Sequence, residues 1–182
     1  MPTLIAARPL PATLLVAVAL TLFTNLAWTE ESKEHFDADP KIQKIAEAYS
    51  LDMVDFAKQR YSIQLDWSDD SVKQVERIGD SLHHDYVKDH PSAEEVAPFY
   101  KMMGSYIGEV FRRNHHAEWG WVTLQGKRFP GMHRDPIGLF WPWGKAQSRI
   151  VNGSEDNLWD YYRSGLLDRL SGLWHGEQRE LQ

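Results

Sequence analysis

The sequence contains no cysteine among its 182 residues. Disulfide bonds, thiolate metal sites, a cysteine nucleophile and a lipid-modified N-terminal cysteine are therefore excluded. It also lacks the short motifs of the commonest nucleophile, nucleotide and calcium sites. The absent patterns are G-x-S-x-G, S-x-x-K, G-x-x-x-x-G-K-[ST], G-x-G-x-x-G and the EF-hand loop.

Basic residues are also in the minority, with 20 Lys and Arg against 26 Asp and Glu and a net charge of −6. A general nucleic-acid binder needs a basic face to neutralise phosphates, so this class is disfavoured. What the sequence does have is aromatic residues, including eight Trp, in a composition that is 42% hydrophobic. Such a chain can bury the core of one ordinary domain.

Charge is scarce in the first 30 residues, where Arg8 is the only charged side chain before Glu30. An uncharged apolar run from Ala12 to Phe23 follows this basic start. The pattern is typical of a secretory signal peptide, and the run is shorter than the roughly 20 apolar residues that span a bilayer. We predict a signal peptide over residues 1–27, with an N-terminal membrane anchor as the alternative. The expected location is periplasmic or secreted, or the inner membrane if the segment stays attached.

After a predicted linker at residues 28–39, apolar residues recur every three or four positions, which predicts helices. The expected helices cover about residues 40–60, 69–90, 93–114, 144–151 and 155–174. Their expected N-caps are Asp39, Ser68, Ser92 and Ser154, and Glu95 completes a capping box with Ser92. Residues 61–67 alternate between apolar and polar side chains, which predicts a short strand or an extended arm.

Two further segments have the pattern of strands. Trp119, Trp121 and Thr123 alternate with smaller or aliphatic residues, and residues 137–141 form a second apolar run. Pro130-Gly131 and Asp135-Pro136 predict turns between them. The sequence therefore predicts an α+β fold of about five helices packed around a small antiparallel β-sheet. A single domain over residues 40–174 and a polar tail at 175–182 are expected.

The central helix contains Gly104 and Gly108, four residues apart beside an apolar stripe. Glycine costs about 1 kcal/mol in a helix interior relative to alanine, so the pair indicates close packing of another element. A G-x-x-x-G membrane dimer is excluded because Lys101, Glu109 and Arg112 would lie in lipid.

The off-stripe edge of this helix holds the catalytic candidates. Glu109 is four residues before Arg113, which is the spacing of an ordinary surface ion pair. In the alternative interpretation, Glu109, Tyr106 and His116 line a cleft in which a carboxylate and an imidazole perform acid–base chemistry.

Aromatic residues give the binding candidates. Four tryptophans flank the two predicted strands: Trp119, Trp121, Trp141 and Trp143. The binding residues that we select are Trp119, Trp121 and Arg113. Aromatic faces can stack on sugars or anchor a protein interface, but packing in the core is the interpretation we prefer for at least two of the four.

The histidines do not predict a metal site, because no pair has the i, i+4 spacing of H-E-x-x-H. The remaining route to a metal or proton site is His84 or His90 meeting His116 in space. We expect no metal and no cofactor.

The run Gly104-Ser-Tyr-Ile-Gly-Glu-Val110, followed by Trp119 and a hairpin rich in Gly and Pro, resembles a bacterial domain-of-unknown-function family. In that family a G-x-Y-x-G-E-V helix precedes a Trp-bearing strand. The resemblance covers roughly residues 66–169 and supplies no catalytic residues. Some domains of similar size and layout act as immunity or partner-binding proteins, which is an analogy at the level of the fold.

These observations favour an exported, non-enzymatic domain that binds a partner, expected to be another envelope protein. One alternative is a small hydrolase or ligand-binding domain that uses a Glu109/His116 cleft. A membrane-anchored accessory protein is the other. No nucleic-acid partner is expected, and membrane contact is expected only through an uncleaved N-terminal segment.

Overall fold

The computed structural model describes residues 34–177. The predicted signal peptide or anchor at residues 1–27 lies outside the described residues, as do residues 28–33 of the predicted linker. No helix within residues 34–177 is both long enough and apolar enough to cross a membrane.

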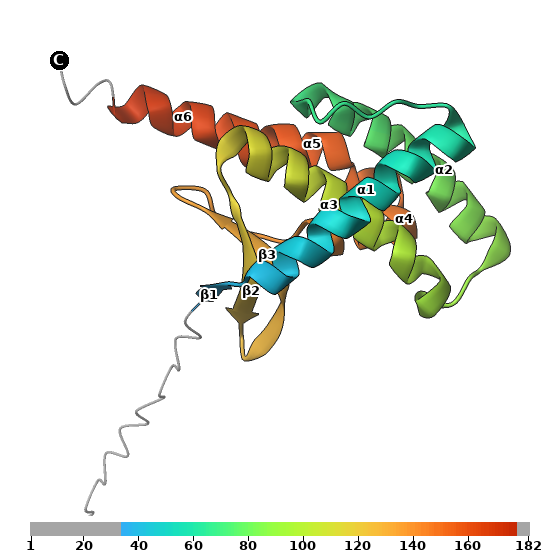
Figure 1. Cartoon of the computed structure of the whole chain (residues 1–182), viewed down its shortest axis with the longest axis horizontal. Helices are drawn as coiled ribbons and strands as arrows, with labels where there is room; N and C mark the ends of the chain where they lie inside the picture. The colour runs from blue at the N-terminus through green and yellow to red at the C-terminus, as the bar shows by residue number, and fades with distance from the viewer. Residues whose placement is uncertain (1–33, 178–182) are drawn as a thin grey trace, which may run out of the picture. The chain divides into compact units, whose positions relative to one another are not determined.

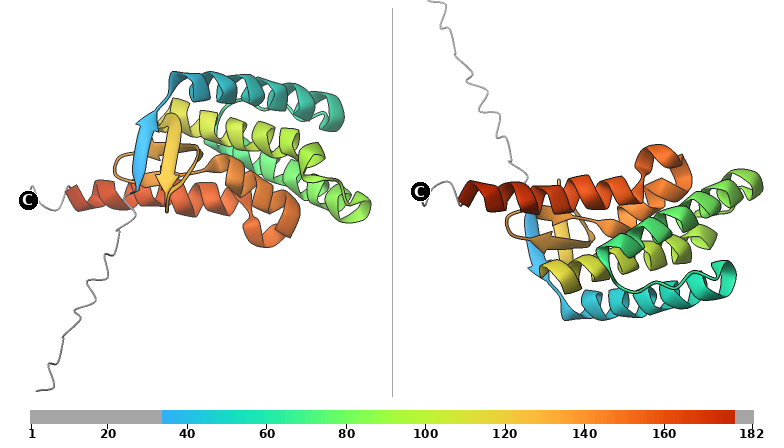
Figure 2. Two further views of the ribbon diagram at one scale, coloured as in Figure 1. Left: turned by 90° about the horizontal axis from the view of Figure 1, so that it is seen from below. Right: turned by 90° about the horizontal axis from the view of Figure 1, so that it is seen from above.

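Helices dominate the described domain and pack with a small sheet, which confirms the predicted α+β fold (Figure 1). The helices are α1 (Pro40–Tyr61), α2 (Val72–Asp89), α3 (Ala93–His115), α4 (Pro142–Asn152), α5 (Leu158–Tyr162) and α6 (Asp168–Glu177). A π-helical turn, Arg163–Leu167, joins α5 to α6. In both views of Figure 2, α3 lies between α1 and the α5–α6 segment.

Most helix starts follow from the predicted capping residues. Asp39 accepts a hydrogen bond from the Lys41 amide over 2.8 Å, and Ser92 and Glu95 form the expected reciprocal capping box. Ser68 caps a 3₁₀ turn, Asp69–Ser71, that leads into α2. Ser154 does not cap the last helix, because it begins a separate 3₁₀ turn, Ser154–Asp156. Asn157 caps α5 instead by accepting from the Asp160 amide.

The sheet has the order β1-β2-β3-β4, and every neighbouring pair is antiparallel. Its strands are β1 (His35–Ala38), β2 (Glu118–Leu124), β3 (Lys127–Arg134) and β4 (Gly138–Phe140). The linker prediction for residues 28–39 is wrong over His35–Ala38, because these residues pair with Gly120–Thr123 of β2. The backbone of β2 supplies the hydrogen-bonding partner for this segment, whose four residues are too few for their alternation to predict a strand.

The prediction of a turn at Pro130-Gly131 is also wrong, because β3 runs straight through both residues. Pro130 lies opposite Trp121 of β2, whereas β4 pairs only with Met132–Arg134. On its β4 side, Pro130 is therefore at an unpaired edge, where the missing N–H of proline disrupts no ladder.

Helix α3 forms the centre of the core, and its two glycines provide close contacts, as predicted. A Cβ on Gly104 would lie 2.6 Å from the carbonyl oxygen of Pro142, at the start of α4. A Cβ on Gly108 would overlap the Trp119 ring of β2 and come within 2.8 Å of the Met132 sulfur. Residues 62–67 form an extended arm rather than a strand and bury Leu65. The predicted tail starts too early, since α6 continues to Glu177.

Candidate functional site

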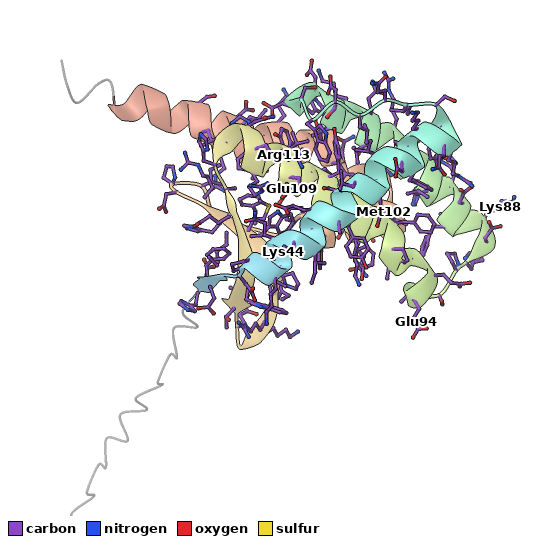
Figure 3. The ribbon with its side chains drawn as sticks, in the orientation of Figure 1. Lys44, Lys88, Glu94, Met102, Glu109 and Arg113 are labelled. Carbon is purple, nitrogen blue, oxygen red and sulfur yellow. The ribbon has the colours of Figure 1, made fainter. Side chains whose placement is uncertain are left out.

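Glu109 lies in the interior, with 0% of its surface exposed. Arg112 donates to both of its carboxylate oxygens over 2.8 and 2.9 Å, and Arg113 donates over 3.2 Å. The indole N–H of Trp119 donates to the same carboxylate over 2.9 Å. A buried charge needs such partners, because desolvation without them costs several kcal/mol. Glu109 therefore does not lie at the rim of a cleft, although Figure 3 shows it on α3 close to Arg113.

Tyr106 and Arg113 both contact Trp67 of the extended arm. The buried Tyr106 hydroxyl accepts from the Trp67 amide over 2.9 Å and lies 2.8 Å from the Ser71 hydroxyl. The Trp67 ring stacks on Tyr106, and the Arg113 guanidinium lies 3.7 Å from the Trp67 ring centroid. Trp67 has a φ of 65°, a left-handed conformation that is rare for a bulky residue. The Tyr106–Trp67–Arg113 stack holds that conformation in place.

The histidines are distributed among separate contacts. His116 is exposed and ends α3 in a left-handed conformation. His84 lies 2.9 Å from the Asp80 carbonyl, and His115 lies 3.0 Å from an Asp69 carboxylate oxygen. Within residues 34–177, no group of three or more His, Asp or Glu side chains is arranged to hold a metal ion. The acid–base role for Glu109, Tyr106 and His116 stays a prediction, and Glu109 itself has no exposed surface.

The four predicted tryptophans have different environments. Trp119 is 2% exposed and belongs to the core. Trp121 is half-buried, donates to Asp39 over 3.0 Å and lies beneath the Arg128 guanidinium. Trp143 donates to the Ser105 hydroxyl over 2.7 Å. Trp141, at 37% exposure, is the large aromatic side chain most open to solvent among residues 34–172.

Trp141 stands between two hollows of the surface. The larger, of about 550 Å³, is bounded by β4, the start of α4 and the α5–α6 segment. The smaller, of about 330 Å³, is lined by Tyr100, Phe129, Pro130 and Trp143. Trp141, Gly144 and Gln147 line both hollows, so the two form one continuous surface, which we call the Trp141 cleft. Alternation in the sequence cannot show which of the four rings is exposed, so Trp141 is not among the binding residues that the sequence predicts.

The far wall of the larger hollow is the π-helical turn, which contributes Gly165 and Leu166. A π-helical insertion widens the helix by one residue and is frequent at functional sites. It also shifts the side chains that follow it, so that Arg169 faces the same hollow as Tyr161. Proximity to this turn is independent support for the hollow as a site.

Charge in the Trp141 cleft is positive, although the whole chain is acidic. Lys145 and Arg169 line the larger hollow, and no carboxylate or imidazole is among the residues that line either hollow. Lys145 is paired with Asp156 over 2.7 Å, and Arg169 donates to the Ile137 carbonyl over 2.7 Å. Burial raises the pKa of Tyr161, so its hydroxyl remains a neutral hydrogen-bonding group.

Comparison with known proteins gives a likeness of fold. No protein-family model and no curated protein matches the chain. A crystal structure from Bacteroides thetaiotaomicron VPI-5482 matches 73% of this chain with a TM-score of 0.54 and 10% sequence identity. The match covers 47% of that chain, so this chain spans about half the length of its structural neighbour. The likeness concerns the fold alone, and the resemblance to a domain-of-unknown-function family stays a prediction.

Proposed function

We propose that this protein is a non-enzymatic binding domain of the bacterial envelope, which captures a partner protein in the Trp141 cleft. The observation that carries the proposal is the position of Trp141, a partly exposed indole with a hollow on each side. Exposed tryptophans beside hollows that can receive side chains are typical hot spots of protein interfaces.

The chemistry of the cleft favours binding over catalysis. Its lining offers aromatic faces, two cations and the amide of Gln147, but neither a carboxylate nor an imidazole as a general base. The alternative hydrolase needs Glu109 as an accessible base, and this carboxylate is enclosed by Arg112, Arg113 and Trp119. The geometry therefore supports the binding domain better than the enzyme.

The envelope location in this proposal depends on the N-terminal sequence pattern. Mass spectrometry of the mature protein tests it directly. We expect a protein that begins after Ala27, whereas a mature chain that still begins at Met1 or Pro2 would favour the membrane-anchored accessory protein.

The proposed site is tested by comparative capture from envelope extracts. Wild-type protein, Trp141→Ala and Leu51→Ala are immobilised at equal density, and the captured proteins are quantified. Leu51 is 56% exposed on α1, so its truncation controls for the loss of any exposed apolar side chain. We expect a protein whose capture falls at least about tenfold with Trp141→Ala and is unchanged with Leu51→Ala. Equal capture by all three proteins would refute the Trp141 cleft as the site.

A further inference from the structure

A separate cavity of about 220 Å³ lies where the C-terminal halves of α1 and α2 meet the start of α3. Its apolar base is formed by Leu82, Val96 and Ile150. Figure 3 labels Lys88 and Glu94, which flank the α2–α3 connection near this cavity and away from the sheet. None of its lining residues is shared with the Trp141 cleft.

Three aromatic side chains line the cavity, and we call Phe56, Tyr86 and Phe99 the aromatic cage. The Phe56 and Phe99 rings are 5.6 Å apart between centroids and inclined at 57°. Tyr61 packs edge-on against Phe56 at 5.7 Å, which supports the position of the Phe56 ring. Aromatic rings that line a small volume can attract a bound cation through the negative faces of their ring quadrupoles.

Carboxylates outnumber cations around this cage. Asp85, Asp89 and Glu95 line the cavity together with one guanidinium, that of Arg60. Arg60 is paired with Asp85 over 3.2 Å, whereas Asp89 forms no ion pair among the side chains of residues 34–172. Asp89 is also the last residue of α2, where the helix dipole adds negative potential. Lys88 in the same turn offsets part of that potential.

We propose that the aromatic cage binds a quaternary ammonium group, the chemistry shared by choline headgroups and trimethylated lysine. Such a group has no N–H to donate, so aromatic faces and apolar side chains satisfy it without matched acceptors. Its positive charge is attracted by the ring faces and by the nearby carboxylates of Asp89 and Glu95. A primary ammonium is more strongly hydrated and would lose more on entering the same apolar volume.

Binding at the aromatic cage is independent of the partner binding proposed for the Trp141 cleft, and each can be tested without the other. The Trp141 cleft has cations in its lining, whereas the aromatic cage has an excess of carboxylates. A quaternary ammonium probe therefore distinguishes the two places by charge.

The direct test is an NMR titration of the full chain with choline and with its neutral carbon isostere, 3,3-dimethylbutan-1-ol. We expect saturable shifts of the Phe56 and Phe99 ring signals with choline, and binding of the neutral alcohol at least about fivefold weaker. Equal affinity for the two probes, or shifts confined to residues outside the cavity, would overturn the proposal.

Substitutions around the cavity test whether choline binds at the aromatic cage. Each variant is first checked for a melting temperature equal to that of the wild type. Asp89→Asn is expected to weaken choline binding about threefold or more, because it removes a negative charge beside the cavity. Arg60→Gln is expected to strengthen choline binding, because it removes a positive charge and leaves Asp85 without its ion-pair partner. Phe99→Leu keeps an apolar side chain but removes one ring face, and should also weaken binding. The matched control is Val87→Ala, at an exposed position on α2 that does not line the cavity. A control effect as large as that of Asp89→Asn would also overturn the proposal.

A second pair of probes distinguishes a choline headgroup from a trimethylated lysine as the natural source of the quaternary ammonium group. The probes are phosphocholine and an Nα-acetylated trimethyllysine amide. Tighter binding of phosphocholine assigns a lipid-type headgroup, and tighter binding of the lysine derivative assigns a modified protein side chain. If neither perturbs the aromatic cage, the proposal is wrong.

Discussion

The indole N–H of Trp119 donates to the Glu109 carboxylate over 2.9 Å, in a part of the core where both side chains are almost fully buried. The contact joins β2 to α3 next to Gly108, where the absence of a side chain makes room for the Trp119 ring. Arg112 and Arg113 supply the opposite charge from the same helix. The G-x-Y-x-G-E-V run is therefore a packing and hydrogen-bonding unit of the domain.

We predict that Glu109→Ala destabilises the protein by about 3–5 kcal/mol, because the Trp119 N–H and two guanidinium groups lose their buried partner. For a chain of this size, that corresponds to a fall in melting temperature of very roughly 6–20 °C. Urea unfolding of both proteins measures the change. Asp52→Ala is the control, since Asp52 is exposed on α1. A loss below about 1 kcal/mol would show that the network contributes little.

Substitution by alanine should change the stability of the protein by different amounts at three glycines. Gly108→Ala places a methyl group against Trp119 and should destabilise the protein by about 1–3 kcal/mol through overpacking. Gly104→Ala meets the backbone of Pro142, which cannot rotate away, and should cost at least as much. Gly172→Ala in α6 has open space around it and should be neutral or stabilising by up to about 1 kcal/mol. Chemical denaturation of the three variants tests this order, which an equal response would contradict.

Truncation of two tryptophans should separate stability from binding. Trp119→Ala removes a core side chain and its bond to Glu109, so we expect a loss of about 3–5 kcal/mol. Trp141→Ala removes a partly exposed ring that contacts Phe129, so its cost should be about 1 kcal/mol. Thermal unfolding followed by circular dichroism measures both. A loss at Trp141 as large as that at Trp119 would mean that Trp141 serves the fold rather than a partner.

Asp69 should contribute stability that depends on pH. Burial raises the pKa of Asp69, but hydrogen bonds from Tyr162, Asn114 and His115 outweigh burial and hold the pKa below its ordinary value. The folded state therefore favours the ionised form, and its contribution is complete above the unfolded pKa of about 3.9. It is lost as pH falls through the lower folded pKa.

We expect Asp69→Asn to lose about 1–3 kcal/mol at pH 6, and the difference from wild type to shrink as pH falls from about 5 to 2. Urea unfolding at several pH values measures this difference. The control is Asp52→Asn, which should show no such trend. A difference between wild type and Asp69→Asn that is constant with pH would exclude ionised Asp69 as the cause.

Local sequence patterns predict the helices well, because their signals lie within a few residues. The cap at Asp39 and the capping box at Ser92 act through hydrogen bonds to nearby amides, and both are present. The glycine pair in α3 correctly indicated close packing, although its partners, Pro142 and Trp119, lie elsewhere in the chain.

Contacts between segments far apart in the sequence explain where the predictions from the sequence are wrong. Strand β1 is only four residues long, so the alternation of Phe36 and Ala38 with polar residues is too short to predict a strand. The segment is a strand because β2 offers hydrogen-bonding partners to His35–Ala38. Pro130 lies in a strand because β4 is too short to reach it. Residue spacing predicted the Glu109–Arg113 pair but not its burial, which results from the approach of β2 and Trp119 to α3.

The sequence by itself determined the helical periods, the caps, the α+β class and the absence of cysteine chemistry, since each is a property of residue type and local spacing. Tertiary structure decided which aromatic side chains are exposed. Trp119 and Trp141 have the same indole ring, but Trp119 enters the space left by Gly108, whereas Trp141 is left between two hollows. The same packing brings Phe56, Tyr86 and Phe99 from three helices around one cavity, because burial depends on contacts between distant segments.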